Sequence, residues 1–148
     1  MTTMTTETKH YLQLLDDRGR TCILLKDKEV IYESDSLGVK PLRLLRMDNF
    51  QKEKGAQLVL IDKVIGKGAL MLAELLGVDE IHTPLASEKA LSYSQQVRIP
   101  LYYETLVPFI ENRDRSGMCP IENAVKDTQD PNLGEKNIEA AIEILMRG

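Results

Sequence analysis

The sequence contains no tryptophan, only two cysteines, only two histidines and 5% aromatic residues over its 148 positions. Cys22 and Cys119 lie far apart and show no metal-ligand spacing, which excludes a disulfide scaffold and favours a reducing compartment. The histidines and cysteines are too scattered to supply the three or four ligands that a zinc site of these residues needs. The sequence therefore predicts no metal and no other cofactor.

Long apolar runs and basic segments are also missing. The longest apolar stretch, residues 69–76, is interrupted by Glu74 and is far shorter than the roughly 20 residues that cross a bilayer. The first nine residues are mostly threonine and show no signal-peptide pattern. A net charge of −4 provides no broad electrostatic footprint for duplex nucleic acid. We therefore expect a cytoplasmic protein whose partners include neither a membrane nor duplex nucleic acid.

The apolar residues that are present, 43% of the chain, follow the periods of both helices and strands. Helical patterns or helix-start signals mark residues 5–17, 41–51, 66–76, 87–96, 120 onward and 134–146. Strand patterns mark residues 21–26, 29–33, 57–61, 78–83 and 99–103, and the first two of these form a β-hairpin around Asp27-Lys28. Helices that alternate with strands predict a three-layer α/β/α sandwich with a mixed five-stranded sheet.

The length suits one domain that spans residues 1–148. Within it we expect residues 1–8 to be flexible and residues 120–148 to form C-terminal helices. The helix over residues 66–76 is apolar nearly all round. Such a helix is buried on more than one side, either inside the fold or against a second copy of the chain.

A strand-to-helix junction at residues 61–68 is the first candidate ligand site. Bare backbone N–H groups and the positive helix end would favour an anion there. Gly66 and Gly68 would let the anion approach the backbone, and Lys63 and Lys67 would add charge. The alternative is that the glycines serve close helix–strand packing and that the lysines are solvated.

A second junction, at residues 35–41, also delivers a helix start after a strand. Gly38 and Lys40 precede Pro41, a residue well suited to the first helical position. Two helix starts on the same side of the sheet would frame one pocket. The alternative is an ordinary loop followed by a helix-starting proline.

The segment Glu111–Glu122 combines a thiol with a helix start. If Pro120 is the first helical residue, Cys119 is the N-cap and Glu122 closes a capping box on it. A thiol at a helix start near Arg113 is expected to have a lowered pKa. This predicts a reactive or ligand-contacting cysteine, whereas the alternative is a purely local cap.

Two histidines complete the candidate residues. His82 falls near the end of the strand over residues 78–83, where it would lie on the ligand side and serve as an acid, a base or a stacking partner. A histidine satisfied within the strand is the alternative. His10 is expected on the surface of the first helix.

Four segments together resemble a small uncharacterised prokaryotic family, domain of unknown function number eighteen ninety-three. They are residues 62–67, 84–90, 107–113 and 117–122, within a likeness that covers residues 12–125. The Asn-Arg…Cys-Pro-x-Glu segment is the most specific of them. The resemblance implies a cytidine-deaminase-like fold, in agreement with the order of elements.

True deaminases of that fold hold a zinc ion at two successive helix starts, through a His-or-Cys/Ala/Glu triplet and a Pro-Cys-x-x-Cys motif. By element order, the corresponding stretches here are residues 38–41 and 65–68, and neither contains a histidine, a cysteine or a glutamate. Zinc-dependent deamination is therefore not expected. The resemblance brings no established reaction with it.

The first functional hypothesis is a diverged deaminase-fold protein that lacks the zinc motifs and binds a nucleotide or another phosphorylated small molecule. The ligand-binding candidates are Gly38, Lys40, Lys63, Gly66, Lys67, Gly68 and Arg113, and the catalytic candidates are Cys119 and His82. One alternative is a non-catalytic regulatory or scaffold module that assembles as a homodimer through the apolar helix. Another is a thiol-based enzyme that uses Cys119.

Overall fold

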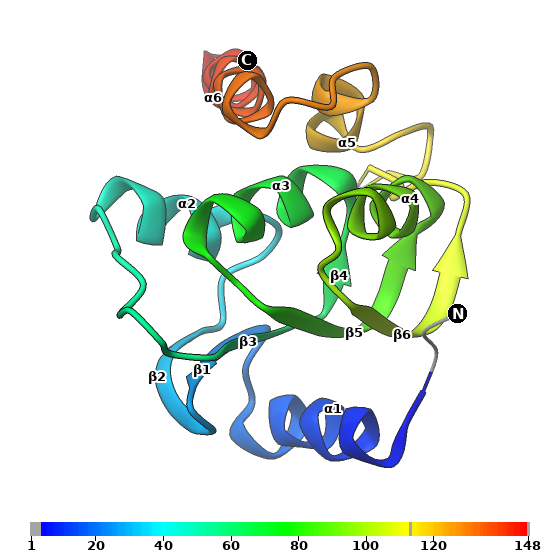
Figure 1. The fold of residues 1–148 in the computed structure, drawn as a ribbon. Helices are drawn as coiled ribbons and strands as arrows, with labels where there is room; N and C mark the ends of the chain where they lie inside the picture. The colour runs from blue at the N-terminus through cyan, green and yellow to red at the C-terminus, as the bar shows by residue number, and fades with distance from the viewer. Residues whose placement is uncertain (1–3, 113, 148) are drawn as a thin grey trace.

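The computed structural model describes residues 4–112 and 114–147, which form six helices and six strands around one mixed sheet (Figure 1). In chain order the elements are α1 (Thr6–Arg18), β1 (Cys22–Lys26), β2 (Glu29–Ser34), α2 (Lys40–Met47), β3 (Leu58–Asp62), β4 (Val64–Ile65), α3 (Lys67–Leu76), β5 (Glu80–Ser87), α4 (Glu88–Val97), β6 (Leu101–Val107), α5 (Pro120–Val125) and α6 (Pro131–Arg147). Over this part of the chain no helix is long and apolar enough to cross a membrane.

The sheet is mixed, as predicted, but has six strands rather than five. β1 pairs antiparallel with both β2 and β3, while β3, β4 and β6 each pair parallel with β5. The additional strand is β4, which pairs with the second half of β5 after Lys63 has separated it from β3. Its two residues are too few to produce a periodic pattern, which is why the sequence does not predict it.

The hairpin between β1 and β2 confirms the prediction from the sequence. Its turn residues Asp27 and Lys28 have φ values of +48° and +73°. Positive φ at both central residues is what a two-residue type I′ turn requires. The register pairs Lys26 with Glu29 across the turn.

Helices cover both faces of the sheet (Figure 1). On one face α1 packs over a small core that contains Leu15 from the helix and Ile23, Val59 and Ile61 from the strands. On the other face α2, α3 and α4 cover the larger core, and α5 and α6 lie beyond α3 (Figure 1). This arrangement leaves α1 as the single helix on its face within the described residues.

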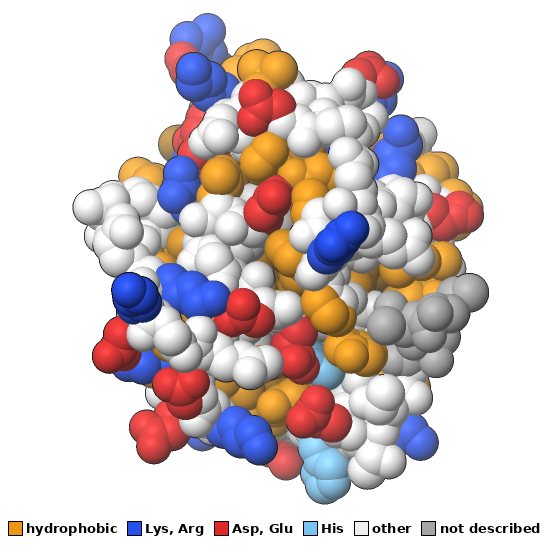
Figure 2. All heavy atoms as spheres, in the orientation of Figure 1, with side chains coloured by type: hydrophobic (Ala, Val, Ile, Leu, Met, Phe, Trp, Pro, Cys, Tyr) orange, Lys and Arg blue, Asp and Glu red, His pale blue; other side chains and the backbone are white. Residues whose placement is uncertain are grey.

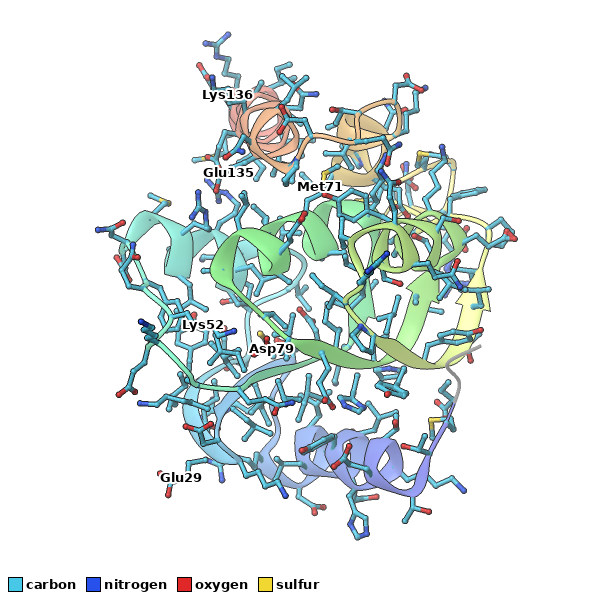
Figure 3. The ribbon with its side chains drawn as sticks, viewed as in Figure 1. Glu29, Lys52, Met71, Asp79, Glu135 and Lys136 are labelled. Carbon is cyan, nitrogen blue, oxygen red and sulfur yellow. The ribbon has the colours of Figure 1, made fainter. Side chains whose placement is uncertain are left out.

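The apolar helix α3 is covered by the chain itself. All residues from Lys67 to Ala73 are buried, and Met71 points toward α6 in Figure 3. A Cβ at Gly68 would lie 3.0 Å from Ile121 Cγ2 and 3.2 Å from Ile138 Cδ1, so this glycine permits the close approach of the C-terminal helices. The apolar surface on which the homodimer prediction rested is therefore already buried, and the pattern no longer indicates a second copy.

Ion pairs fix the position of α6 beside α2. Arg43 donates two hydrogen bonds to Glu139, and Arg46 donates two to Glu135. Figure 3 shows Glu135 on the side of α6 that faces α2. Bidentate geometry of this kind is more specific than a single surface contact.

Several element boundaries differ from the predicted ones: α2 ends at Met47 rather than at residue 51, and β6 runs from Leu101 to Val107 rather than over residues 99–103. α1 begins at Thr6, inside the segment 1–8 that the sequence predicts to be flexible, and residues 1–3 lie outside the described range. α6 begins at Pro131 rather than at residue 134. β5 runs from Glu80 to Ser87, later and longer than the predicted strand over residues 78–83.

Candidate functional site

The start of α3, where the sequence predicts an anion, holds a carboxylate of the chain itself. Glu122 is 2% exposed, and its Oε1 accepts hydrogen bonds from Lys67 N at 2.8 Å and Ser87 Oγ at 3.2 Å. Its other oxygen accepts from Ile110 N at 2.9 Å. A negative group at this position is favoured by the helix dipole and by the unpaired amide. Any further anion at this helix end would have to share it with Glu122.

Glu122 therefore does not form the predicted capping box. Cys119 is the N-cap of α5, as expected, but its side chain makes no capping hydrogen bond. Its backbone N–H instead donates to Ile110 O. The carboxylate that the local pattern assigns to the start of α5 reaches across to α3, because two buried donors, Lys67 N and Ser87 Oγ, and the part-buried Ile110 N converge there.

Lys67 is not solvated, contrary to one of the two interpretations of its motif. The residue is 3% exposed, and its Nζ donates to Lys126 O at 3.4 Å and lies 6.0 Å from the centre of the Tyr93 ring. Burial is the main cause that lowers the pKa of Lys67. Lys67 therefore helps to hold α5 and the segment after it against α3.

The other residues predicted around the helix starts do not all lie in one place. Gly38 has a φ of +64° and open space around it, and Lys40 begins α2 as an exposed residue. Lys63 lies between β3 and β4, on the α1 side of the sheet. Arg113 lies outside the described residues. A shared pocket between the starts of α2 and α3 stays a prediction.

A buried carboxyl group that sequence reasoning missed lies at the end of β3. Asp62 is paired in register with Cys22 of β1, and its Oδ2 has no hydrogen-bond partner among the described residues. Burial raises the pKa of Asp62 well above its usual range. The pKa of the Cys22 thiol is also raised, chiefly by burial and then by the neighbouring Asp62.

The α1 side of the sheet carries an open cavity of about 420 Å³, which we call the α1 crevice. It is lined by Met4, Lys9, Leu12, Gln13, Leu15, Asp16, Lys63, Pro84 and Glu104. Four of its five α1 residues, Lys9, Leu12, Gln13 and Asp16, share one helix face because they are spaced three and four apart. Lys63 enters the crevice from the carboxyl end of β3.

His82 lies on the same side of the sheet, near the start of β5 rather than near its end. The residue is fully buried. Its ring stacks on Tyr102, with the centres 4.8 Å apart, and contacts Tyr11 of α1 at 4.7 Å. The predicted position near the end of the strand is wrong because β5 continues for five residues past His82.

Comparison with known proteins identifies a family for most of the chain. The sequence profile of domain of unknown function DUF1893 matches residues 10–142. A crystal structure of a DUF1893 family protein from Thermotoga maritima has 24% sequence identity and a TM-score of 0.76 to this chain, and the match covers 95% of this chain and 91% of that one. A search of curated proteins found no match.

Proposed function

The chain belongs to the DUF1893 family, and we propose that it binds a nucleotide or another phosphorylated small molecule in the α1 crevice. The observation that carries this proposal is the crevice itself. Its volume of about 420 Å³ falls in the range of small-molecule sites, which are concave and combine apolar walls with a few polar groups.

Two lysines supply the charge that a phosphate requires. Lys9 of α1 and Lys63 after β3 both line the crevice and are both exposed, so an anion that enters from solvent can reach their ammonium groups. The sequence predicts that Lys63 contacts an anion at the start of α3. In the proposal Lys63 keeps that role, but the anion lies in the α1 crevice, on the opposite face of the sheet. Lys9 had no motif to mark it.

The remaining walls suit the rest of a nucleotide. Leu12, Leu15 and Pro84 provide apolar surface, against which a flat base or a sugar can pack. Asp16 and Glu104 provide acceptors in the same crevice, and they match the amino groups of a nucleobase. A simple inorganic anion has no donor groups for these two carboxylates and would be repelled by their negative charge.

The location also agrees with a general rule for α/β sheets. Ligands collect beyond the carboxyl ends of the strands, and Lys63 directly follows the end of β3. The cytidine-deaminase-like fold implied by the sequence resemblance is part of this proposal, since zinc deaminases of that fold act on nucleobases. The proposal includes no deamination and assigns no catalytic residue.

Thermal unfolding with added ligands tests the proposal. The full chain is heated with each of the common nucleoside 5′-monophosphates and with inorganic phosphate, and at least one nucleotide is expected to raise Tm in a saturable way, because ligand that binds only the folded state stabilises it. Lys63→Glu and Lys9→Glu are each expected to weaken binding about tenfold or more, since each places a negative charge against the phosphate.

Lys136→Glu is the matched control, because it makes the same charge reversal on α6, on the far side of the molecule from α1 (Figure 3). It should leave the ligand effect unchanged. The proposal fails if no nucleotide raises Tm, or if the Lys63→Glu and Lys136→Glu proteins respond to the ligand alike.

A further inference from the structure

His82 lies in a polar setting beneath α1, although it is fully buried. Its Nδ1 is 3.0 Å from Thr8 Oγ1, and its Nε2 is 2.6 Å from Glu80 Oε2. A neutral imidazole carries one N–H and one lone pair. In the tautomer whose Nδ1–H donates to Thr8, the lone pair of Nε2 faces the Glu80 carboxylate and a cation could bind to both; in the other tautomer, Nε2–H donates to Glu80.

A second carboxylate completes a possible ligand set. Glu7, in the first turn of α1, lies close enough that one oxygen from each carboxylate and one ring nitrogen of His82 are all within 4.8 Å of one another. Three atoms with this spacing fall within about 2.8 Å of a common centre, so side-chain shifts of about 1 Å or less, which include a small separation of His82 Nε2 from Glu80 Oε2, bring them to the ~2.0–2.2 Å distances of zinc to nitrogen and oxygen.

We propose that Glu7, Glu80 and His82 form a binding site for a divalent transition-metal ion of the zinc class. Imidazole together with carboxylates suits such ions, whereas magnesium and calcium prefer oxygen ligands alone. Three protein ligands leave a fourth position for water, as in zinc sites that stay open to solvent. The site lies between α1 and the start of β5, on the opposite face of the sheet from the start of α3.

The groups around His82 fix the ring in the orientation that a metal ligand needs. The Thr8 hydroxyl lies at Nδ1 and is itself 2.9 Å from the Thr5 hydroxyl at the N-cap of α1. Tyr102 stacks on the ring at an angle of 11°, and Tyr11 packs against it from α1. With Nδ1–H donated to Thr8, Nε2 presents its lone pair toward the two carboxylates.

The site has an entry path from solvent. A second cavity, of about 300 Å³, is lined by Glu7, Tyr11 and Glu80 together with residues from the β1–β2 turn and the start of β3. Figure 2 shows several acidic side chains gathered on the face of the molecule where α1 meets the sheet. This second cavity lies toward the amino ends of β3 and β5, whereas the α1 crevice lies toward their carboxyl ends.

Calorimetric titration of the full chain with ZnCl₂, after treatment with a chelator and dialysis, tests this site. We expect one ion per chain, with a dissociation constant of about 10 μM or lower, and a rise in Tm with added zinc. Glu7→Gln removes one ligand charge at an exposed position and is expected to weaken binding about tenfold or more without changing the far-UV circular dichroism spectrum. His82→Asn is expected to abolish binding.

His10→Asn is the essential control, because His10 is the other histidine of the chain and lies three residues from Glu7 on α1. It should bind zinc as the unmodified chain does. The proposal is overturned if no binding is detected at 1 mM zinc, if Glu7→Gln binds like the unmodified chain, or if His10→Asn removes binding. Because the Glu7→Gln protein keeps its fold, its result decides the matter even if His82→Asn does not fold.

Discussion

Replacement of Glu122 by glutamine perturbs the group that holds the C-terminal third of the chain to α3. The carboxylate is buried and accepts from Lys67 N, Ile110 N and Ser87 Oγ. A glutamine retains one oxygen but turns an amino group toward one of these donors. One buried N–H or O–H then loses its acceptor, at a cost of about 1–3 kcal/mol, and the helix loses a negative charge at its start, worth about 0.3–2 kcal/mol.

We therefore expect Glu122→Gln to lower the free energy of unfolding by about 2–4 kcal/mol. Urea unfolding followed by circular dichroism measures this, since the chain has no tryptophan for fluorescence. Glu111→Gln makes the same change at an exposed position of the neighbouring segment and should have an effect below about 0.5 kcal/mol. If Glu122→Gln is as stable as Glu111→Gln, the carboxylate does not hold α3 and α5 together.

Three further predictions concern other parts of the fold. Burial raises the pKa of Asp62, so above the usual aspartate pKa the folded chain binds more protons than the unfolded chain, and the free energy of unfolding falls as pH rises. Urea titrations at about pH 5 and pH 8 should therefore show that the Asp62→Asn protein loses less stability between these pH values than the unmodified chain, by at least about 1 kcal/mol. Equal losses in the two proteins would contradict the raised pKa of Asp62. Gly68→Ala should destabilise by about 1–2 kcal/mol, because its Cβ would press on Ile121 and Ile138, whereas Gly117→Ala, with open space around it, should stay within about 0.5 kcal/mol of the unmodified chain in the same assay. Arg46→Ala should lower the free energy of unfolding by about 0.5–1 kcal/mol, because Arg46 loses its ion pair with Glu135. If this loss is the same in high salt, the packing of the Arg46 side chain rather than its charge accounts for it.

Sequence reasoning succeeds where the signal is local. The hairpin at Asp27-Lys28, the strand over residues 57–61 and the helix over residues 66–76 all follow from a few adjacent residues, and the structure confirms them as β1–β2, β3 and α3 to within a residue at each end. Ser87, the first residue of the predicted helix over residues 87–96, is the N-cap of α4, since its hydroxyl accepts from Ala90 N. In each case the residues that decide the conformation lie within one turn or one strand of one another.

Sequence reasoning fails where the interacting residues lie far apart along the chain. The Glu122 side chain bonds to a residue 55 positions away, whereas the capping-box pattern considers only three. Glu80 lies two residues from His82 on the same face of β5, but Glu7 approaches the pair only after α1 has packed on β5, so no spacing rule finds the complete set. α6 explains why α3 is apolar all round, yet the pattern within α3 alone cannot distinguish a covering helix from a second copy.

An NMR titration of ¹⁵N-labelled full chain with a nucleoside 5′-monophosphate tests the central claim most directly, because it locates the ligand residue by residue. If the α1 crevice is the binding site, the amide signals of Lys9, Leu12 and Lys63 shift in a saturable way, while those of Gly66, beside the Glu122 carboxylate, and of Gly68 stay in place. Shifts confined to Gly66 and Gly68 would contradict the account and would return the ligand to the helix start.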